Sequence, residues 1–351
     1  MNTDSRGPIR IGLAGLGRAG LGMHVPELAN YPQLFKIVAV CDPIKERRDE
    51  AVRQLGCRAY RAYGDLLADA DVELVDIATR SDDHFEHGLA ALKARRWVLL
   101  EKPLALDYDE AIKLRAASVK AGNRLFVRHN RRFEPGFNQA REVIASGVLG
   151  MVYDIRLRRG GFQRRDDWQA IKRCGGGQLL NWGPHIIDHA LQFLGTQPVH
   201  LFADLKRIAA VGDAEDYVRI LLRNSAGLSV DLEISGGRIL PEPECTVTGT
   251  RGALSLIGKT LRLRHLDPGR PLARRRASVR TPKPGSFGTP ETLPWVEREL
   301  TVEPTETVSM HAMWRHLHGA IRRNKPFPVT LDQAVEVMRV IDAARKDTPF
   351  A

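Results

Sequence analysis

The sequence of 351 residues is poor in cysteine and in long apolar runs. Its four cysteines are far apart and form no CxxC pair, so neither a disulfide framework nor a cysteine metal site is expected; they are Cys41, Cys57, Cys174 and Cys245. Reduced thiols favour an intracellular, cytoplasmic location. Residues 1–8 lack an apolar core, so no signal peptide is expected, and no run of apolar residues is long enough to cross a bilayer.

Acidic residues are fewer than basic ones. Lys and Arg number 53 against 42 Asp and Glu, which gives a formal net charge of +11. The basic residues are spread along the chain with acids between them, and no zinc-finger, RNA-binding or basic heptad pattern accompanies them, so no nucleic-acid partner is expected. The length and the apolar content of 43% suit a globular protein of two domains.

The first part of the chain alternates short apolar runs with helical segments. This alternation predicts a parallel sheet joined by right-handed crossovers, and hence a dinucleotide-binding Rossmann domain over residues 1–128. The predicted strands are Ile9–Ala14, Phe35–Cys41, Val72–Ala78, Val98–Leu100 and Leu125–Val127, with helices at 43–55, Asp83–Ala94 and Asp109–Ala121.

Beyond Gly150 the pattern changes to strands in which polar and apolar residues alternate, as in half-buried antiparallel sheets. The fold class predicted for the chain is therefore α/β, with an α+β domain at residues 129–351 built on an open, largely antiparallel sheet. Its strands are expected at 152–158, 201–206, 218–223, 228–234, 246–249 and 261–265, and helices at 182–194, 308–321 and 331–344; the last of these is expected near 331–346, packed back on the Rossmann domain.

Residues 268–294 are rich in Pro, Gly and Arg and predict a long loop. Two interpretations stay open. The loop is either a solvated excursion or a flap over a neighbouring subunit or an anionic substrate.

A glycine motif ends the first predicted strand. Gly15, Gly17 and Gly20 form GxGxxG, and Asp42 lies at the end of the next strand, 22 residues past Gly20. Gly15 suits a tight turn, Gly17 lets the backbone approach a pyrophosphate, and Gly20 allows helix and strand to pack closely. An acid at position 42 accepts hydrogen bonds from ribose hydroxyls and repels a 2′-phosphate, so the motif, with Arg18 and Ala19 inside it, predicts NAD rather than NADP.

Further motifs follow in a specific order. The chain resembles the glucose–fructose oxidoreductase / inositol dehydrogenase / rhizopine catabolism (Gfo/Idh/MocA) family over almost its whole length. The residues that carry the resemblance are the glycine motif, Asp42, Ile77-Ala78-Thr79 with His84, Glu101-Lys102-Pro103, Asn130–Pro135, Gly175–Gly177, His185 with Asp188, and the segment from Asn324 to Ala344.

The resemblance implies a Rossmann domain followed by an open-faced sheet that assembles homodimers or homotetramers. It also implies reversible hydride transfer between NAD(P) and a carbinol carbon of a sugar or cyclitol. Lys102 and His185 take the positions of the family's catalytic residues, and the cofactor site extends to Thr79, Arg80, His84 and Glu101.

The chain departs from the family pattern at two positions. Asn181 stands where an aspartate is common, and an amide can position a hydroxyl but cannot act as a base, so Lys102 and His185 share the proton transfer. Arg80 stands where a proline is common; it contacts the cofactor or an anionic substrate, or it points to solvent.

Lys102 and His185 are the predicted catalytic residues, with Asn181 assisting. Lys102 ends a parallel strand, where open α/β sheets bind ligands, and partial burial beside a cationic nicotinamide would make its amine a usable base. By resemblance, the Lys102–Pro103 bond is a candidate cis peptide. His185 holds the reacting hydroxyl or relays its proton, and Asn181, His185 and Asp188 are expected on one helix face. No third ligand accompanies His185 and Asp188, so no metal is expected.

Other substrate contacts are expected from Asn130, Arg132 and Trp168. Arg132 either contacts substrate or pairs with a neighbouring acid, and Trp168 either stacks on a sugar face or packs in the protein.

Three functions compete. The first is a dehydrogenase of a sugar, sugar derivative or cyclitol; the second is a glycoside-processing enzyme that keeps NAD bound and uses transient oxidation and elimination; the third is a non-catalytic NAD-dependent sensor, against which Lys102 and His185 argue. Substrate identity, reaction direction and oligomeric state stay open.

Overall fold

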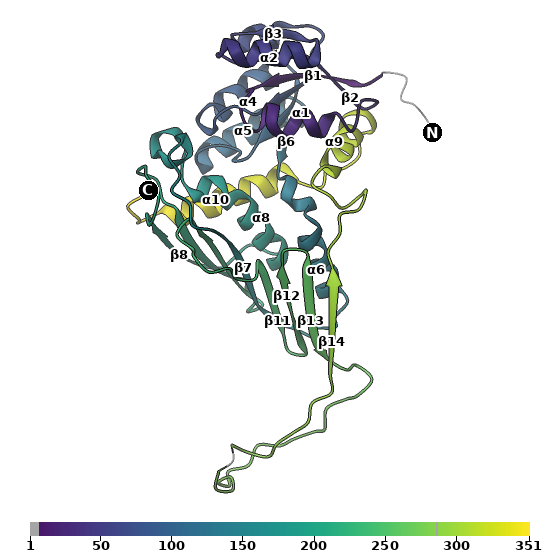
Figure 1. Cartoon of the computed structure of the whole chain (residues 1–351), viewed down its shortest axis with the longest axis vertical. Helices are drawn as coiled ribbons and strands as arrows, with labels where there is room; N and C mark the ends of the chain where they lie inside the picture. The colour runs from purple at the N-terminus through teal and green to yellow at the C-terminus, as the bar shows by residue number, and fades with distance from the viewer. Residues whose placement is uncertain (1–6, 286) are drawn as a thin grey trace.

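The computed structural model describes residues 7–285 and 287–351, so the expectation for the N-terminus lies mostly outside the described residues. The chain builds two sheets, one from its first 128 residues and one from residues 152–301. In Figure 1 the first sheet and its helices form the upper part of the molecule, and the second sheet fans out below them. Among the described residues, no helix is long and apolar enough to cross a membrane.

The first sheet has the order and direction expected of a Rossmann fold. All its strands are parallel, in the order β3-β2-β1-β4-β5-β6, and the reversal between β1 and β4 marks the switch point where such sheets bind ligands. The strands are β1 (Ile9–Ala14), β2 (Phe35–Cys41), β3 (Arg58–Tyr60), β4 (Leu74–Ile77), β5 (Trp97–Glu101) and β6 (Leu125–Arg128). The sequence pattern predicted five of them and missed the three-residue β3.

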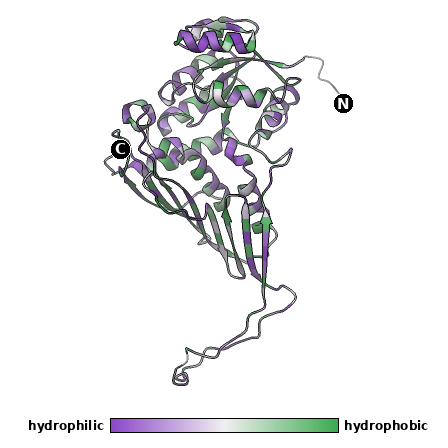
Figure 2. Cartoon of the chain, in the orientation of Figure 1, coloured by the Kyte–Doolittle hydropathy of each residue, from purple (hydrophilic) through white to green (hydrophobic). Residues whose placement is uncertain are grey.

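Each face of this sheet has its own apolar core, because neighbouring residues of a strand point to opposite faces. Leu74 of β4 belongs to one core with Ile11, whereas Val75 and Ile77 belong to the other. The crossover helices are α1 (Val25–Leu28), α2 (Lys45–Leu55), α3 (Tyr63–Ala68), α4 (His84–Lys93) and α5 (Tyr108–Lys120). In Figure 2 α2 is largely hydrophilic, and only its Ala51 is buried.

The second sheet has the order β14-β13-β12-β11-β7-β10-β9-β8. It is antiparallel except for the β7–β10 pair, in agreement with the expected open, largely antiparallel sheet. The strands are β7 (Val152–Gly160), β8 (His200–Lys206), β9 (Tyr217–Arg223), β10 (Ser229–Ser235), β11 (Cys245–Gly249), β12 (Gly252–Ile257), β13 (Thr260–Leu266) and β14 (Trp295–Thr301). Strands β12 and β14 were not predicted.

Helices cover one face of the second sheet. They are α6 (Pro135–Ala145), α7 (Gln178–Asn181), α8 (Gly183–Leu194) and α10 (Leu331–Arg345), whereas α9 (Ala312–Arg323) lies against the first sheet. Helix α10 lies against α5, where Asp342 Oδ2 accepts a 2.8 Å hydrogen bond from the Tyr108 amide. Helix α9 also returns to the first sheet, where the fully buried Trp314 lies edge-on to Phe35.

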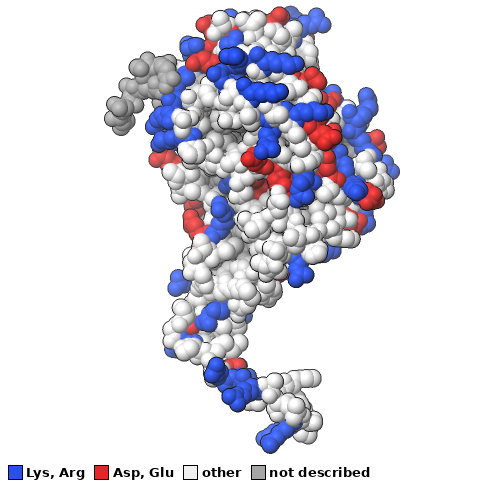
Figure 3. Space-filling view, turned by 180° about the vertical axis from the view of Figure 1, so that it is seen from behind, with Lys and Arg blue, Asp and Glu red and all other residues white. Residues whose placement is uncertain are grey.

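The segment between β13 and β14 forms a long arm. Figure 1 shows it leaving the edge of the second sheet and extending away from the body. Six Lys or Arg and one Glu lie between residues 268 and 294, and the positive charge is conspicuous along the arm in Figure 3. Arg275 ties the two legs of the arm together, because its guanidinium contacts the Glu291 carboxylate at 2.9 Å and the Thr289 carbonyl at 2.7 Å.

Candidate active site

The glycine turn after β1 is shaped by close backbone contacts. Gly15 has φ of +91°, and a Cβ there would lie 2.5 Å from the carbonyl oxygen of Ala78. A Cβ on Gly20 would lie 2.0 Å from the Gly15 carbonyl oxygen. Gly17 faces open space, with only Arg47 Nη1 at 3.9 Å from its hypothetical Cβ. The turn thus fits a pyrophosphate that approaches the backbone at Gly17.

Asp42 lies behind this turn and is almost completely buried. Its carboxylate accepts hydrogen bonds from the Leu16 amide at 2.8 Å and from the Ile44 amide at 2.9 Å. Arg47 Nη1 lies 3.5 Å from the same carboxylate. Asp42 therefore holds the glycine turn in place, at the end of β2 where a ribose is expected, with a cation beside it.

His84 connects the ends of two neighbouring strands. Its Nδ1 lies 2.7 Å from the Pro103 carbonyl oxygen, and its Nε2 lies 3.4 Å from that of Thr79. Burial lowers the pKa of His84, so the ring is neutral at neutral pH and donates to Pro103 from Nδ1. Arg80 pairs with Asp82 at 3.1 Å, and its guanidinium lies 5.5 Å from the ring centre of Trp168.

Lys102 follows β5 directly, in a turn whose Lys102–Pro103 peptide is cis, as the resemblance implied. Its Nζ donates to Asn181, at 3.0 Å to the carbonyl oxygen and 3.4 Å to Oδ1. Burial lowers the pKa of Lys102 to about 8, against the opposing effect of the Glu101 carboxylate. The structure therefore brings Lys102 and Asn181 together, with a lysine amine that loses its proton more readily than an exposed one.

Asn181 ends the short helix α7, which begins after the glycine run. Gly177 has φ of +107°, and a Cβ there would lie 2.2 Å from the Glu215 carboxylate, so only glycine fits this approach. Gln169 Nε2 donates to Asn181 Oδ1 at 3.3 Å. The Asn181 amide oxygen thus has two donors, from Gln169 and Lys102, which fix its orientation.

His185 lies on α8, one turn beyond Asn181. Burial, together with the charges of Lys102 and Arg131, lowers the pKa of His185 well below its usual range, so the ring is neutral. Among the residues that the structure describes, its Nδ1 has no hydrogen-bond partner, and neither does Nδ1 of the buried His129, whose ring centre lies 6.3 Å away. Lys102 and Asn181 are both half-buried, and the charge of Lys102 acts on the buried His185.

Two other expected residues have structural partners. Arg132 is buried and its Nε donates to Asp188 Oδ2 at 2.7 Å, while its Nη1 contacts Gln333 at 3.2 Å. This is the interpretation in which Arg132 pairs with a neighbouring acid. Asp188 faces Arg132, and Asn181 lies on α7 whereas His185 and Asp188 lie on α8, so the three residues do not form one continuous helix face. Asn130 is buried in the turn after β6.

Several residues near the site were missed by sequence reasoning. Arg131, the neighbour of Arg132, lies 4.3 Å from the ring centre of Trp182, and Arg159 lies 5.4 Å from the same centre. The Trp182 ring lies 6.0 Å from that of His185. The sequence showed two adjacent arginines after a strand, and nothing local indicated which one would face the site.

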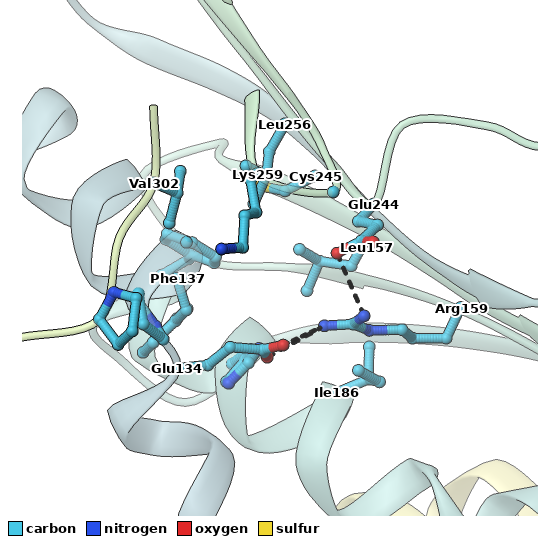
Figure 4. Close-up of a pocket in the computed structure, with 16 residues that line it drawn as sticks. Glu134, Phe137, Leu157, Arg159, Ile186, Glu244, Cys245, Leu256, Lys259 and Val302 are labelled. Atoms are coloured by element: carbon cyan, nitrogen blue, oxygen red, sulfur yellow. Dashed lines mark hydrogen bonds and ion pairs between the residues drawn. The ribbon is translucent and has the colours of Figure 1, made fainter. Parts of the chain in front are cut away.

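A separate cavity of about 200 Å³ lies between α6, α8 and the second sheet. Figure 4 shows Arg159 between the carboxylates of Glu134 and Glu244, at 2.9 and 3.1 Å, among apolar side chains such as Phe137 and Leu256. Neither Lys102 nor Asn181 lines this cavity. Within the described part of the chain, no group of three or more His, Cys, Asp or Glu is arranged to hold a metal ion.

These features define a dinucleotide-dependent oxidoreductase with its site at the carboxyl ends of the parallel strands. Two family models match the chain: an oxidoreductase family with an NAD-binding Rossmann fold at residues 9–129, and the GFO/IDH/MocA C-terminal domain at residues 137–255. The chain belongs to the Gfo/Idh/MocA oxidoreductase family.

Three proteins similar to this chain have informative names or structures. The scyllo-inositol 2-dehydrogenase (NADP(+)) IolW of Bacillus subtilis is 25% identical over 97% of this chain and 94% of that protein. The 2,7-anhydro-N-acetylneuraminate hydratase of Escherichia coli is 27% identical over 68% of this chain and 66% of that protein. A crystal structure of an oxidoreductase from Thermotoga maritima has the same fold, with a TM-score of 0.81 at 21% identity, over 97% of this chain and 96% of that one.

The glycine turn gives a first testable prediction. Gly20→Ala is expected to weaken NAD binding at least about tenfold, because the new Cβ would collide with the Gly15 carbonyl oxygen and displace the turn. Isothermal titration measures the affinity. Gly22→Ala is the matched control, since nothing lies within 4 Å of its Cβ. Equal affinities for the two variants would show that the turn does not bind the cofactor.

Proposed function

We propose that this protein transfers a hydride between NAD and a carbinol carbon of a sugar, a sugar derivative or a cyclitol. The observation that carries the proposal is the contact of Lys102 with Asn181 at the end of β5, with a lysine pKa of about 8 and a neutral His185 close by. Alcohol oxidation requires a base at this position and a donor or acceptor that orients the hydroxyl.

Bound NAD supplies the hydride acceptor. In the direction of oxidation, the neutral amine of Lys102 takes the hydroxyl proton of the substrate and becomes an ammonium, while the carbinol C–H bond breaks and leaves a carbonyl. Asn181 holds the lysine by its carbonyl and side-chain oxygens. His185, with a free Nδ1, hydrogen-bonds the reacting oxygen. In the direction of reduction the Lys102 ammonium returns the proton.

The substrate class is a small polyhydroxylated ring or chain. Support comes from inositol dehydrogenases among the relatives and from the Asn181 amide beside the lysine, which suits a hydroxyl group. Trp168, half-buried beside Arg80, is the proposed stacking surface, and Asn130 lies in the turn that follows β6. Arg132 is left out of the proposed substrate site because its guanidinium is paired with the Asp188 carboxylate.

A second candidate function has support from one relative, which is named as a hydratase of an anhydro sugar. In this candidate NAD stays bound, a ring carbon is oxidised, a leaving group is eliminated, and the carbon is reduced again. The same lysine and histidine serve both functions. Accumulation of free NADH during turnover distinguishes the dehydrogenase, whereas turnover without it indicates the internal redox cycle.

We also propose that the second sheet assembles a homodimer or homotetramer in the cytoplasm. The sheet has one face covered by helices, and its other face carries exposed apolar residues, Phe202 and Leu221 among them. A monomeric mass in light scattering would contradict the assembly.

The base assigned to Lys102 gives a prediction on pH. In the direction of oxidation, kcat/KM is expected to fall about tenfold per pH unit below pH 8, because the amine becomes protonated there, and to level off above it. Lys102→Met should lower kcat by about 10²–10⁴-fold. Lys93→Met, on the exposed face of α4, is the control and should retain activity. Full activity of Lys102→Met would refute the assignment.

The cofactor preference follows from Asp42. The wild-type protein is expected to bind NAD more tightly than NADP, because a buried carboxylate repels a 2′-phosphate. Asp42→Asn should raise the affinity for NADP about tenfold, since the charge is removed while Arg47 stays in place. Asp49→Asn, on α2, serves as the control. Calorimetric titration with both cofactors is the measurement, and tighter binding of NADP to the wild-type protein would overturn the preference.

A further inference from the structure

A buried histidine that the mechanism does not use lies directly behind the catalytic lysine. His24 ends the π-helix Gly20–His24, which follows the glycine turn, and its side chain is fully buried. Its Nδ1 lies 2.8 Å from Asp76 Oδ2 on β4, and its Nε2 lies 3.0 Å from Glu101 Oε1 at the end of β5. Each ring nitrogen thus faces a carboxylate oxygen, and only a protonated imidazole can donate to both.

Glu101 is the residue that joins His24 to the lysine. Its Oε1 also accepts from Arg128 Nη1 at 2.8 Å, so two cationic donors meet at one oxygen. Its other oxygen, Oε2, accepts from the Lys102 backbone amide at 3.0 Å. The position of the lysine backbone therefore depends on the orientation of this carboxylate.

The rest of the cluster extends away from the lysine. Arg128 Nη2 contacts Glu27 Oε2 at 2.5 Å, and Trp314 Nε1 donates to that same oxygen at 2.7 Å. His311 Nδ1, on the approach to α9, lies 3.9 Å from Glu27 Oε1. On its other side, Glu101 also faces the buried histidines His84 and His129 and the Lys102 amine.

The charges of this cluster require a cation at His24. Three buried carboxylates belong to it, Asp76, Glu101 and Glu27, against one permanent cation, Arg128. Buried carboxylates without compensating charge are costly, so a neutral imidazole would leave a large uncompensated charge. Burial by itself lowers the pKa of His24, but Asp76 and Glu101 raise it to about 9.

We propose that His24, as a buried imidazolium, is a positioning residue that clamps Glu101 between itself and Arg128 and thereby sets the place and the proton affinity of Lys102. The proposal rests on the proposed function in one respect, the role of Lys102 as the base. The arrangement of Glu101 between His24 and Arg128 affects Lys102 in two ways. It holds the carboxylate whose second oxygen binds the Lys102 amide, and it neutralises part of the carboxylate charge that would otherwise favour the ammonium.

Loss of the His24 imidazolium is expected to change the pKa of Lys102. A neutral side chain at position 24 leaves Glu101 with more uncompensated negative charge, and a negative charge beside a lysine stabilises its protonated form. The pKa of Lys102 should then rise, and less free amine should exist at neutral pH. A purely structural histidine would lower stability without this change.

The test measures the titration of Lys102 directly. Competitive acetylation with acetic anhydride between pH 6 and 11, read by peptide mass spectrometry, reports the free amine of Lys102 in the folded protein. In His24→Gln the fraction of free amine at pH 7 is expected to fall about tenfold relative to the wild-type protein. The control is Trp314→Phe, which removes a donor from Glu27 on the far side of the cluster and should leave the Lys102 titration unchanged. Unchanged labelling in a folded His24→Gln variant would overturn the proposal.

A second measurement uses the wild-type protein and does not depend on whether the variant folds. Nuclear magnetic resonance of the wild-type protein with 15N-labelled histidine should show one imidazolium that remains charged at pH 8. A neutral His24 ring at pH 7 would overturn the proposal even if the variant did not fold. Neither measurement needs turnover. If Lys102→Met retained activity, the proposed function would fail, while the labelling and resonance results would still decide the role of His24.

Discussion

The structure depends on a cluster of buried charges at the carboxyl ends of β4, β5 and β6. Asp76, Glu101 and Arg128 each end or lie within a parallel strand, and His24 and Glu27 come from the segment that follows the glycine turn. Taking several charges out of water is costly, and in this cluster each residue has at least one partner of opposite charge. The strand ends, the cofactor turn and the lysine are thereby held in one arrangement.

The cluster also bears on the pKa of Lys102, which is half-buried. Burial alone would favour the neutral amine, and the adjacent Glu101 alone would favour the ammonium. The balance between these effects places the pKa of Lys102 near 8. His84, bonded to Pro103 and close to Thr79, fixes the turn from the other side.

Much of the Rossmann domain could be predicted because buried parallel strands appear as short apolar runs and because the glycine turn requires particular residue types. β1 and β2 agree with prediction to the residue. Strand β3 is only three residues long, and β14 carries Glu, Arg and Glu in sequence, so neither shows a clear apolar period. That Lys102 and Asn181, 79 residues apart, belong to one site was expected from the family resemblance, and their direct contact was not predicted. The roles of His24 and Arg128 depend on which strands are neighbours, and no local pattern contains that information.

The position of α9 has a consequence for how the chain matures. One face of β1 and β4, with Ile9, Ile11 and Leu74, is covered by residues that include Trp314 and Leu317, which come almost 200 positions after the end of β6 at Arg128. A ribosome adds about 5–20 residues per second, so the interval between completion of β6 and arrival of Trp314 is roughly 10–40 seconds. During that interval the nascent Rossmann domain presents an uncovered apolar face, and Glu27 lacks its indole donor. The enzyme therefore completes its cofactor domain only when nearly the whole polypeptide has been synthesised. A chain truncated before α9 would expose this apolar face and bind chaperones, and it would not fold as an independent nucleotide-binding module.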